Sequence, residues 1–115
     1  MDLKELQTQI HQEAKSKGWW DQEIDTDPVC KLSLVISEVI EAIEEYRNGH
    51  EMAERYYKFE EFGKNKPEGI PSELADVVIR VLDLAEFFEI DLDEVIQEKL
   101  AYNRTRPHRH GNKRF

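Results

Sequence analysis

The chain has 115 residues, 25 of them acidic and 16 basic, which is the length of one domain and gives a formal net charge of −9. An acidic protein is repelled by phosphate backbones, so nucleic-acid binding is disfavoured. No apolar run exceeds three residues, whereas a membrane helix needs roughly 20. The first ten residues carry charges where a signal peptide would be apolar, and the one cysteine excludes an internal disulfide, so we expect a cytoplasmic protein without membrane contact.

Basic charge is concentrated at the C-terminal end of the chain. Residues 104–115 contain five bases and no acid, which leaves a net charge of −14 on residues 1–103. This end has no apolar periodicity, so we expect one domain over residues 1–104 and a basic tail over residues 105–115. Hydrophobic residues make up 39% of the chain, a low share for a domain that must build a core by itself. A core shared with a second copy of the chain would add stability.

Four segments have the apolar spacing of amphipathic helices. The predicted helices cover residues 2–17, 28–48, 71–88 and 91–104. Asp27 and Asp91 are suitable N-caps, and Pro28 suits the first helical position. Gly18 and Gly49 follow the first two helices and favour their termination.

The segment between the second and third helices is less regular. We expect a short helix over residues 51–62 and a loop over residues 63–69, whose sequence GKNKPEG is rich in turn-forming residues. No alternation of apolar and polar residues indicates a strand, and no long repeat is visible. The predicted fold class is therefore all-α, a bundle of four main helices.

Two acidic pairs stand inside the apolar helices. Glu38 and Glu41 are three residues apart, as are Glu73 and Asp76, so each pair lies on one helix face with Cβ atoms about 5–6 Å apart. Because apolar residues surround both pairs, we expect them to border the core, where carboxylates need a counter-charge. Arg80 and Lys31 are the bases close in sequence. Oxygen ligands without histidine or cysteine favour a hard divalent cation, Mg²⁺ or alternatively Mn²⁺.

A simpler explanation exists for these pairs. Two acidic residues on one side of a helix usually mark its solvent-exposed face, and such pairs arise by chance in a chain with 25 acidic residues. Two pairs with the same spacing, each inside an apolar helix, weaken that explanation. Spacing alone leaves both interpretations open.

The two pairs also resemble a family signature. Glu38-Val-Ile-Glu41 followed by Glu73-Leu-Ala-Asp76 is similar to the E-x-x-E … E-x-x-D motif of the MazG-like all-α nucleoside triphosphate pyrophosphohydrolases, and the flanking S-E-V-x-E-A-x-E and S-E-L-A-D-V-V-I agree. The resemblance runs from about His11 to Lys113. The 31 residues between the half-motifs are slightly more than usual, and the segment 51–69 accounts for them.

The resemblance implies hydrolysis of a nucleoside triphosphate between its α- and β-phosphates, releasing a nucleoside monophosphate and pyrophosphate. It implies that Glu38, Glu41, Glu73 and Asp76 are magnesium ligands. We assign Glu41 the additional role of orienting or deprotonating the attacking water. Related enzymes are dimers or tetramers whose active sites draw on neighbouring chains, so we expect a homodimer or homotetramer acting in housecleaning or control of nucleotide pools.

The end of the chain resembles the phosphate-binding part of the family. Lys99 and Asn103 are four residues apart on one helix face, and Arg106 and Lys113 follow in Y-N-x-x-R-P and H-G-x-K elements. We expect these four residues to bind the triphosphate. The alternative is a helix C-terminus that carries bases because the helix dipole favours them there.

Base recognition is expected just before the first acidic helix. Trp19 and Trp20 offer stacking surfaces, and His11 precedes them; some dCTP-preferring family members have a histidine and a tryptophan in comparable places. The alternative is a hydrophobic plug at a helix end. No P-loop or Rossmann motif is present.

Two other classes of protein are compatible with an acidic helical chain. A di-iron helical bundle needs Glu-x-x-His pairs, and neither Glu41 nor Asp76 has a histidine three residues away. A non-catalytic helical adaptor would use the basic tail, residues 105–115, to bind an acidic partner or nucleic acid.

Overall fold

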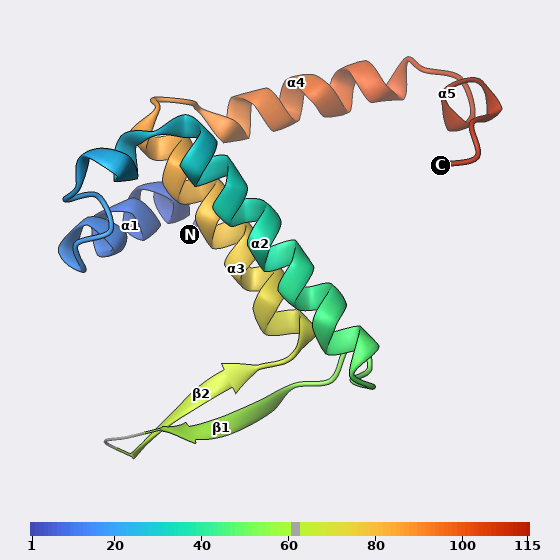
Figure 1. Ribbon diagram of the computed structural model, residues 1–115. Helices are drawn as coiled ribbons and strands as arrows, with labels where there is room; N and C mark the ends of the chain where they lie inside the picture. Colours follow the sequence, from blue (N-terminus) through green and yellow to red (C-terminus); the bar gives the residue numbers. More distant parts are fainter. Residues whose placement is uncertain (61–62) are drawn as a thin grey trace.

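The computed structural model describes residues 1–60 and 63–115 of the chain. Its elements, in chain order, are α1 (Leu3–Ser16), η1 (Glu23–Thr26), α2 (Pro28–Arg47), β1 (Tyr56–Glu60), β2 (Lys64–Glu68), α3 (Ile70–Phe87), α4 (Leu92–Arg104) and α5 (Arg109–Asn112) (Figure 1). The four predicted main helices are confirmed, each within one or two residues of the predicted bounds.

Short polar side chains fix where the long helices begin. The Asp27 carboxylate accepts hydrogen bonds from the backbone amides of Val29 and Cys30 at 2.8 and 3.3 Å, and Pro28 is the first helical residue of α2. Asp91 accepts a hydrogen bond from the Glu94 amide at 3.1 Å at the start of α4. Both predicted caps are therefore confirmed, because they depend on local sequence alone.

The segment between α2 and α3 is a β-hairpin, which corrects our prediction. Strands β1 and β2 pair antiparallel, with Tyr56 opposite Glu68 and Glu60 opposite Lys64. The helix predicted over residues 51–62 is wrong for the part described, 51–60, while residues 61–62 lie outside the described chain; the loop predicted over 63–69 is mostly strand β2. Aromatic residues in β1 favour extended backbone, and their burial pattern has no clear period of two, so alternation could not show the strand.

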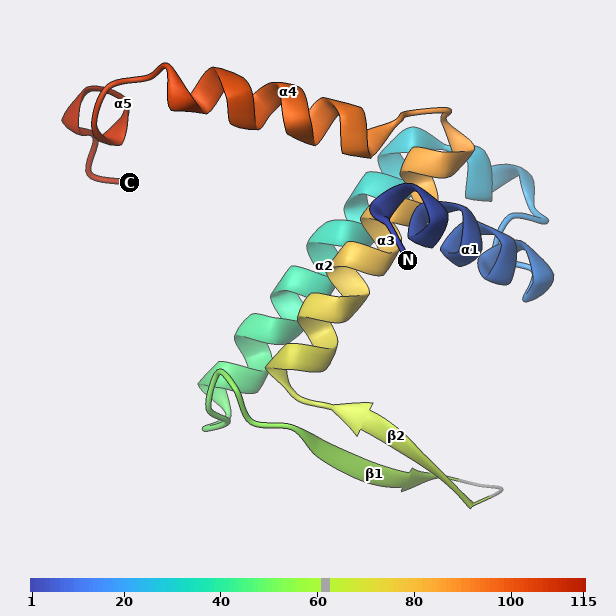
Figure 2. The same ribbon diagram turned by 180° about the vertical axis from the view of Figure 1, so that it is seen from behind.

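Helices α2 and α3 run antiparallel, side by side, and α1 packs against the later part of α3 (Figures 1 and 2). The buried apolar side chains of the described residues are few: Ala42, Ile70, Leu82 and Ala85. A polar contact adds to them, because buried Gln7 on α1 donates hydrogen bonds to Glu86 Oε2 at 3.0 Å and to the Ile90 carbonyl at 2.8 Å. The core of one chain is therefore small.

Much of the apolar stripe of α2 faces outward in the single chain. Side chains of this stripe remain between 42% and 60% exposed: Leu32, Ile36, Val39, Ile40, Ile43 and Tyr46. The helix predicted from this periodicity is confirmed, but these side chains are not covered by the described part of the same chain. The expectation of a thin separate core agrees with this exposure.

Helix α4 extends away from the other helices, and α5 lies at its far end (Figures 1 and 2). Residues 93–115 are exposed. The predicted bundle of four helices therefore holds three packed helices in one chain, with the fourth projecting as an arm. None of the described helices has the length and apolar character needed to cross a membrane.

Candidate metal centre and adjoining hollows

Three carboxylates from the predicted set converge between α2 and α3. One oxygen of Glu38, one of Glu73 and one of Asp76 all lie within 4.8 Å of one another. Glu38 projects from the middle of α2 and is only 7% exposed, and the other two come from the first turns of α3. The antiparallel packing of the two helices thus joins half-motifs that are far apart in the sequence.

Arg80 supplies the counter-charge to the buried member of this cluster. Its Nε donates a hydrogen bond of 2.8 Å to Glu38 Oε1. Burial alone raises the pKa of Glu38, but the Arg80 guanidinium and the neighbouring carboxyls of Glu41 and Glu73 together hold that pKa below its ordinary value. Glu38 is therefore ionised at neutral pH. Lys31, the other predicted counter-charge, instead donates to the Trp19 carbonyl at 3.1 Å.

For Glu73 and Asp76, the other two acids of the cluster, the surroundings disfavour the ionised form. Burial, followed by contact with the Glu41 and Glu38 carboxyls, raises the pKa of Glu73 to about 8. Burial, followed by the charge of Glu38, also raises the pKa of Asp76. Glu41, which is exposed on α2, therefore lies close enough to act on both Glu38 and Glu73. The cluster repels its own negative charge unless a cation or a proton is present.

Two oxygens of this cluster bear on whether a metal ion fits between the helices. Glu38 Oε2 and Glu73 Oε2 are buried and have no hydrogen-bond partner. A buried carboxylate oxygen without a partner costs free energy, and a hard divalent cation coordinated by oxygen atoms removes that cost. The donor set fits Mg²⁺ or Mn²⁺, because every donor is a carboxylate.

We predict that the metal-free protein loses stability as pH rises. The folded-state pKa of Glu73 is about 8 and its ordinary value is 4.5, so the folded state holds a proton that the unfolded state has lost. The contribution of Glu73 is therefore fully present below about pH 4.5 and lost as pH passes through about 8. Thermal unfolding in a chelator should show this fall, and Glu73→Gln should flatten it. Equal slopes for both proteins would contradict the prediction.

A second group of acidic residues, which the sequence did not predict, lies beside the first where the hairpin meets α2 and α3. One oxygen each of Glu45, Glu68 and Glu73 lies within 4.8 Å of the others, so Glu73 belongs to both groups. The Tyr56 hydroxyl donates to both oxygens of Glu45 at 2.9 Å, and this contact raises the Tyr56 pKa to about 12. Lys66 lies 3.3 Å from Glu68. Interpreting residues 63–69 as a loop hid buried Glu68, and no sequence signal marked it.

The predicted base-binding residues fall into two environments. Trp20 Nε1 donates to both oxygens of Asp83 at 3.0 and 3.1 Å, and its ring stacks on Phe87 with centroids 4.2 Å apart. His11 Nδ1 lies 2.7 Å from Asp83 Oδ1. The His11 contact joins α1 to α3, and the Trp20 contacts hold the segment after α1 against the same helix. Trp19 is 66% exposed.

Trp19 lines a hollow next to the carboxylates. This hollow has a volume of about 360 Å³, and its wall includes Lys31, Glu38, Asp76 and Arg80. Of the three residues expected to bind a base, Trp19 is the one that borders the hollow. Binding of a base there stays a prediction.

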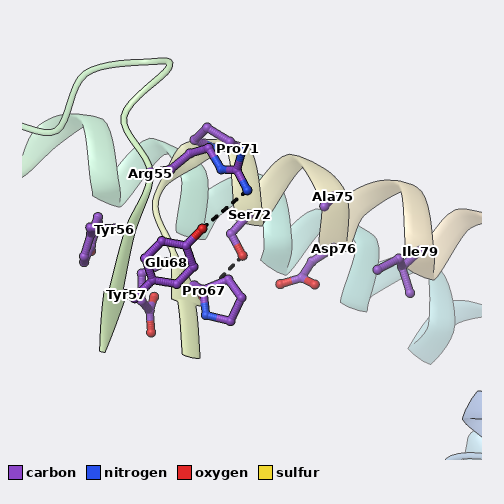
Figure 3. Close-up of a pocket in the computed structure, with 10 residues that line it drawn as sticks. All are labelled: Arg55, Tyr56, Tyr57, Pro67, Glu68, Pro71, Ser72, Ala75, Asp76 and Ile79. Carbon is purple, nitrogen blue, oxygen red and sulfur yellow. Dashed lines mark hydrogen bonds between the residues drawn. The ribbon is translucent and has the colours of Figure 1, made fainter. Parts of the chain in front are cut away.

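A second hollow lies between the hairpin and α3 (Figure 3). Its volume is about 450 Å³, and Arg55, Tyr57 and Asp76 are among the residues that line it. Arg55 Nη2 lies 3.4 Å from the Tyr57 hydroxyl, and Ser72 Oγ donates to the Pro67 carbonyl at 3.3 Å. Arg55 and Tyr57 were not among the predicted site residues, because the helix predicted over residues 51–62 gave them no place beside α3.

The predicted phosphate-binding residues lie elsewhere in the single chain. Lys99 and Asn103 are exposed on α4, and Arg106 and Lys113 are exposed beyond it. Lys99 Nζ and Arg106 Cζ lie 5.6 and 5.8 Å from the ring centre of Tyr102. Because α4 extends away from α2 and α3, the chain does not bring these residues to its own carboxylates (Figures 1 and 2).

Comparison with known proteins identifies the class. The sequence profile of the MazG nucleotide pyrophosphohydrolase domain matches residues 32–110, which is more than half of the chain and includes both acidic pairs. The chain belongs to the MazG nucleotide pyrophosphohydrolase domain family. Searches of curated proteins and of solved structures each found no match.

Proposed function

We propose that the protein is a magnesium-dependent pyrophosphohydrolase that converts a ribo- or deoxyribonucleoside triphosphate into the monophosphate and pyrophosphate. The observation that carries this proposal is the pair of buried oxygens without partners, Glu38 Oε2 and Glu73 Oε2, within a carboxylate cluster. The family to which the chain belongs supports the reaction class. We place the activity in the cytoplasm, as housecleaning or control of nucleotide pools.

The three residues of the cluster and the neighbouring Glu41 receive distinct roles. Glu38, Glu41, Glu73 and Asp76 would hold the metal ion. Bound Mg²⁺ supplies neutralisation of phosphate charge and lowers the pKa of a coordinated water. Glu41 is exposed on the same helix as buried Glu38, so its carboxylate can accept a proton from the attacking water. Arg80 keeps Glu38 ionised and in place through its 2.8 Å hydrogen bond.

We further propose that the active protein is a homodimer or homotetramer. The exposed apolar stripe of α2 needs cover, and Val95, Ile96 and Leu100 on the projecting α4 are also 38–43% exposed. Residues 1–103 carry a net charge of −14, whereas residues 104–115 at the far end of the arm are basic, so this basic end of one copy is attracted to the body of another. Lys99, Asn103, Arg106 and Lys113 would then bind phosphates at the partner's carboxylates.

Mixing two inactive variants tests this sharing of a site. We expect Glu38→Gln and Lys99→Ala each to lose most activity alone. If each site combines Glu38 of one copy with the partner's Lys99, random pairing makes half of the dimers mixed, each with one intact site, and activity returns to about a quarter of wild type. Sedimentation measures the assembly. No recovery after exchange of subunits would contradict the sharing.

The function itself is tested by pyrophosphate release. Purified protein with Mg²⁺ is offered the four canonical ribonucleotides, the four deoxyribonucleotides and oxidised or deaminated triphosphates. We expect pyrophosphate and monophosphate in equal amounts from at least one, and none in a chelator. If no triphosphate is cleaved and Mg²⁺ leaves the melting temperature unchanged, the proposal fails. Salt-sensitive binding to an acidic partner, lost on removal of residues 105–115, would then favour the adaptor.

A further inference from the structure

The two hollows beside the metal cluster adjoin along α3. Both are lined by Asp76 and Ile79, so these two residues lie where one hollow meets the other. Ser72 lines the hairpin side and Asp83 lines the side near α1. They are eleven positions apart on the helix, so the combined trough follows α3 for about 16 Å. Two carboxylates of the cluster line this trough: Asp76 borders both hollows, and Glu38 borders the one near α1.

Each end of the trough is lined by an aromatic side chain and a positively charged side chain. Trp19 and Lys31 line the end near α1. Tyr57 and Arg55 line the hairpin end, and Tyr57 is 54% exposed, so part of its surface is open to a ligand (Figure 3). An aromatic ring stacks on any nucleobase, and a guanidinium pairs with phosphate oxygens or stacks beside the base.

A nucleoside triphosphate has one base and can occupy one end only. With its phosphates at the carboxylates and its base at Trp19, the hairpin end is unused. The apolar wall residues Pro67 and Pro71 at that end, with Ile79 at the junction of the hollows, suit a flat ring better than free phosphate. The Arg55 side chain adds a positive charge near the path of a phosphate chain leaving the cluster. This combination favours a second nucleoside.

We propose that the hollow between the hairpin and α3 binds a second nucleoside, and that the protein also hydrolyses dinucleoside polyphosphates. This inference rests on the proposed pyrophosphohydrolase function, because it uses the same carboxylates. Water adds to the phosphorus next to one nucleoside, and the bond from that phosphorus to its bridging oxygen breaks. The bridging oxygen leaves with the other phosphates, giving a nucleoside monophosphate and a nucleoside polyphosphate, and both protons of the attacking water pass to solvent when the two products are fully ionised.

The test compares two substrates on the full-length protein with Mg²⁺. The rate constant kcat/KM is measured for diadenosine tetraphosphate and for ATP, and their ratio is the readout. We expect Tyr57→Ala to lower this ratio about tenfold, because stacking on one base is lost. Arg55→Ala should also lower the ratio of the two kcat/KM values. Phe59→Ala is the matched control: this aromatic residue is on the same strand, is 80% exposed and lies outside the residues that line the hollow.

A binding measurement tests the second nucleoside site without relying on catalytic turnover. Calorimetry with the Glu38→Gln variant should give tighter binding of diadenosine tetraphosphate than of ATP, and adding Tyr57→Ala should abolish the difference. Cleavage of nucleoside triphosphates but not of diadenosine tetraphosphate overturns the inference and leaves the proposed function standing. An unchanged ratio in Tyr57→Ala and Arg55→Ala also overturns it. Failure to cleave either substrate class overturns both.

Discussion

Glu38→Gln should reduce pyrophosphate release to less than about one thousandth of wild type while the chain stays folded. Glutamine has the same shape and can still accept the hydrogen bond that Arg80 Nε gives to Glu38 Oε1. It cannot provide a charged ligand oxygen where Glu38 Oε2 is now buried without a partner. Asp76→Asn should have the same effect, because Asp76 belongs to the same cluster.

A glutamate outside the cluster provides the control for this experiment. Glu44→Gln makes the identical change on the same helix, where the side chain is exposed and pairs with Arg47 at 3.1 Å. It should keep full activity, since such a surface ion pair contributes little. Pyrophosphate release and calorimetric Mg²⁺ binding are measured for all variants. Normal activity in both Glu38→Gln and Asp76→Asn would remove the site assignment.

Gly69→Ala should destabilise the protein by about 3 kcal/mol, the second large effect that we expect. Gly69 precedes α3 with φ of +107°, a conformation that alanine adopts only with strain. A Cβ atom there would lie 2.6 Å from the Glu54 carbonyl oxygen, so backbone must move as well. That movement would shift the hairpin from α3, and activity on dinucleoside polyphosphates should fall with stability.

Gly49→Ala separates the two causes of this loss. Gly49 also has a positive φ, +96°, but a Cβ atom there meets nothing within 4 Å. Its substitution should cost about 1 kcal/mol, from backbone strain alone. Urea unfolding curves give both free energies. Equal losses at the two positions would show that contact with Glu54 is unimportant.

The sequence predicted the helices and the two acidic pairs because both depend on short spacings. Asp27 with Pro28 and Asp91 mark helix starts through hydrogen bonds to amides within three residues. The three-residue spacing of each acidic pair fixes a shared helix face before any tertiary contact forms. The family signature then joined the two pairs, and the profile match over residues 32–110 confirmed the family.

Other features follow only from contacts between distant residues. The hairpin depends on pairing of β1 with β2 and on Tyr56 reaching Glu45, so local propensity did not indicate it. The sequence could not separate Trp19 from Trp20, because their difference lies in the contacts of Trp20 with Asp83 and Phe87. The apolar stripe of α2 was visible, whereas its exposure in one chain was not, since periodicity says which face is apolar and not what covers it. Sequence determined the elements and their chemistry; tertiary packing decided which of those groups meet.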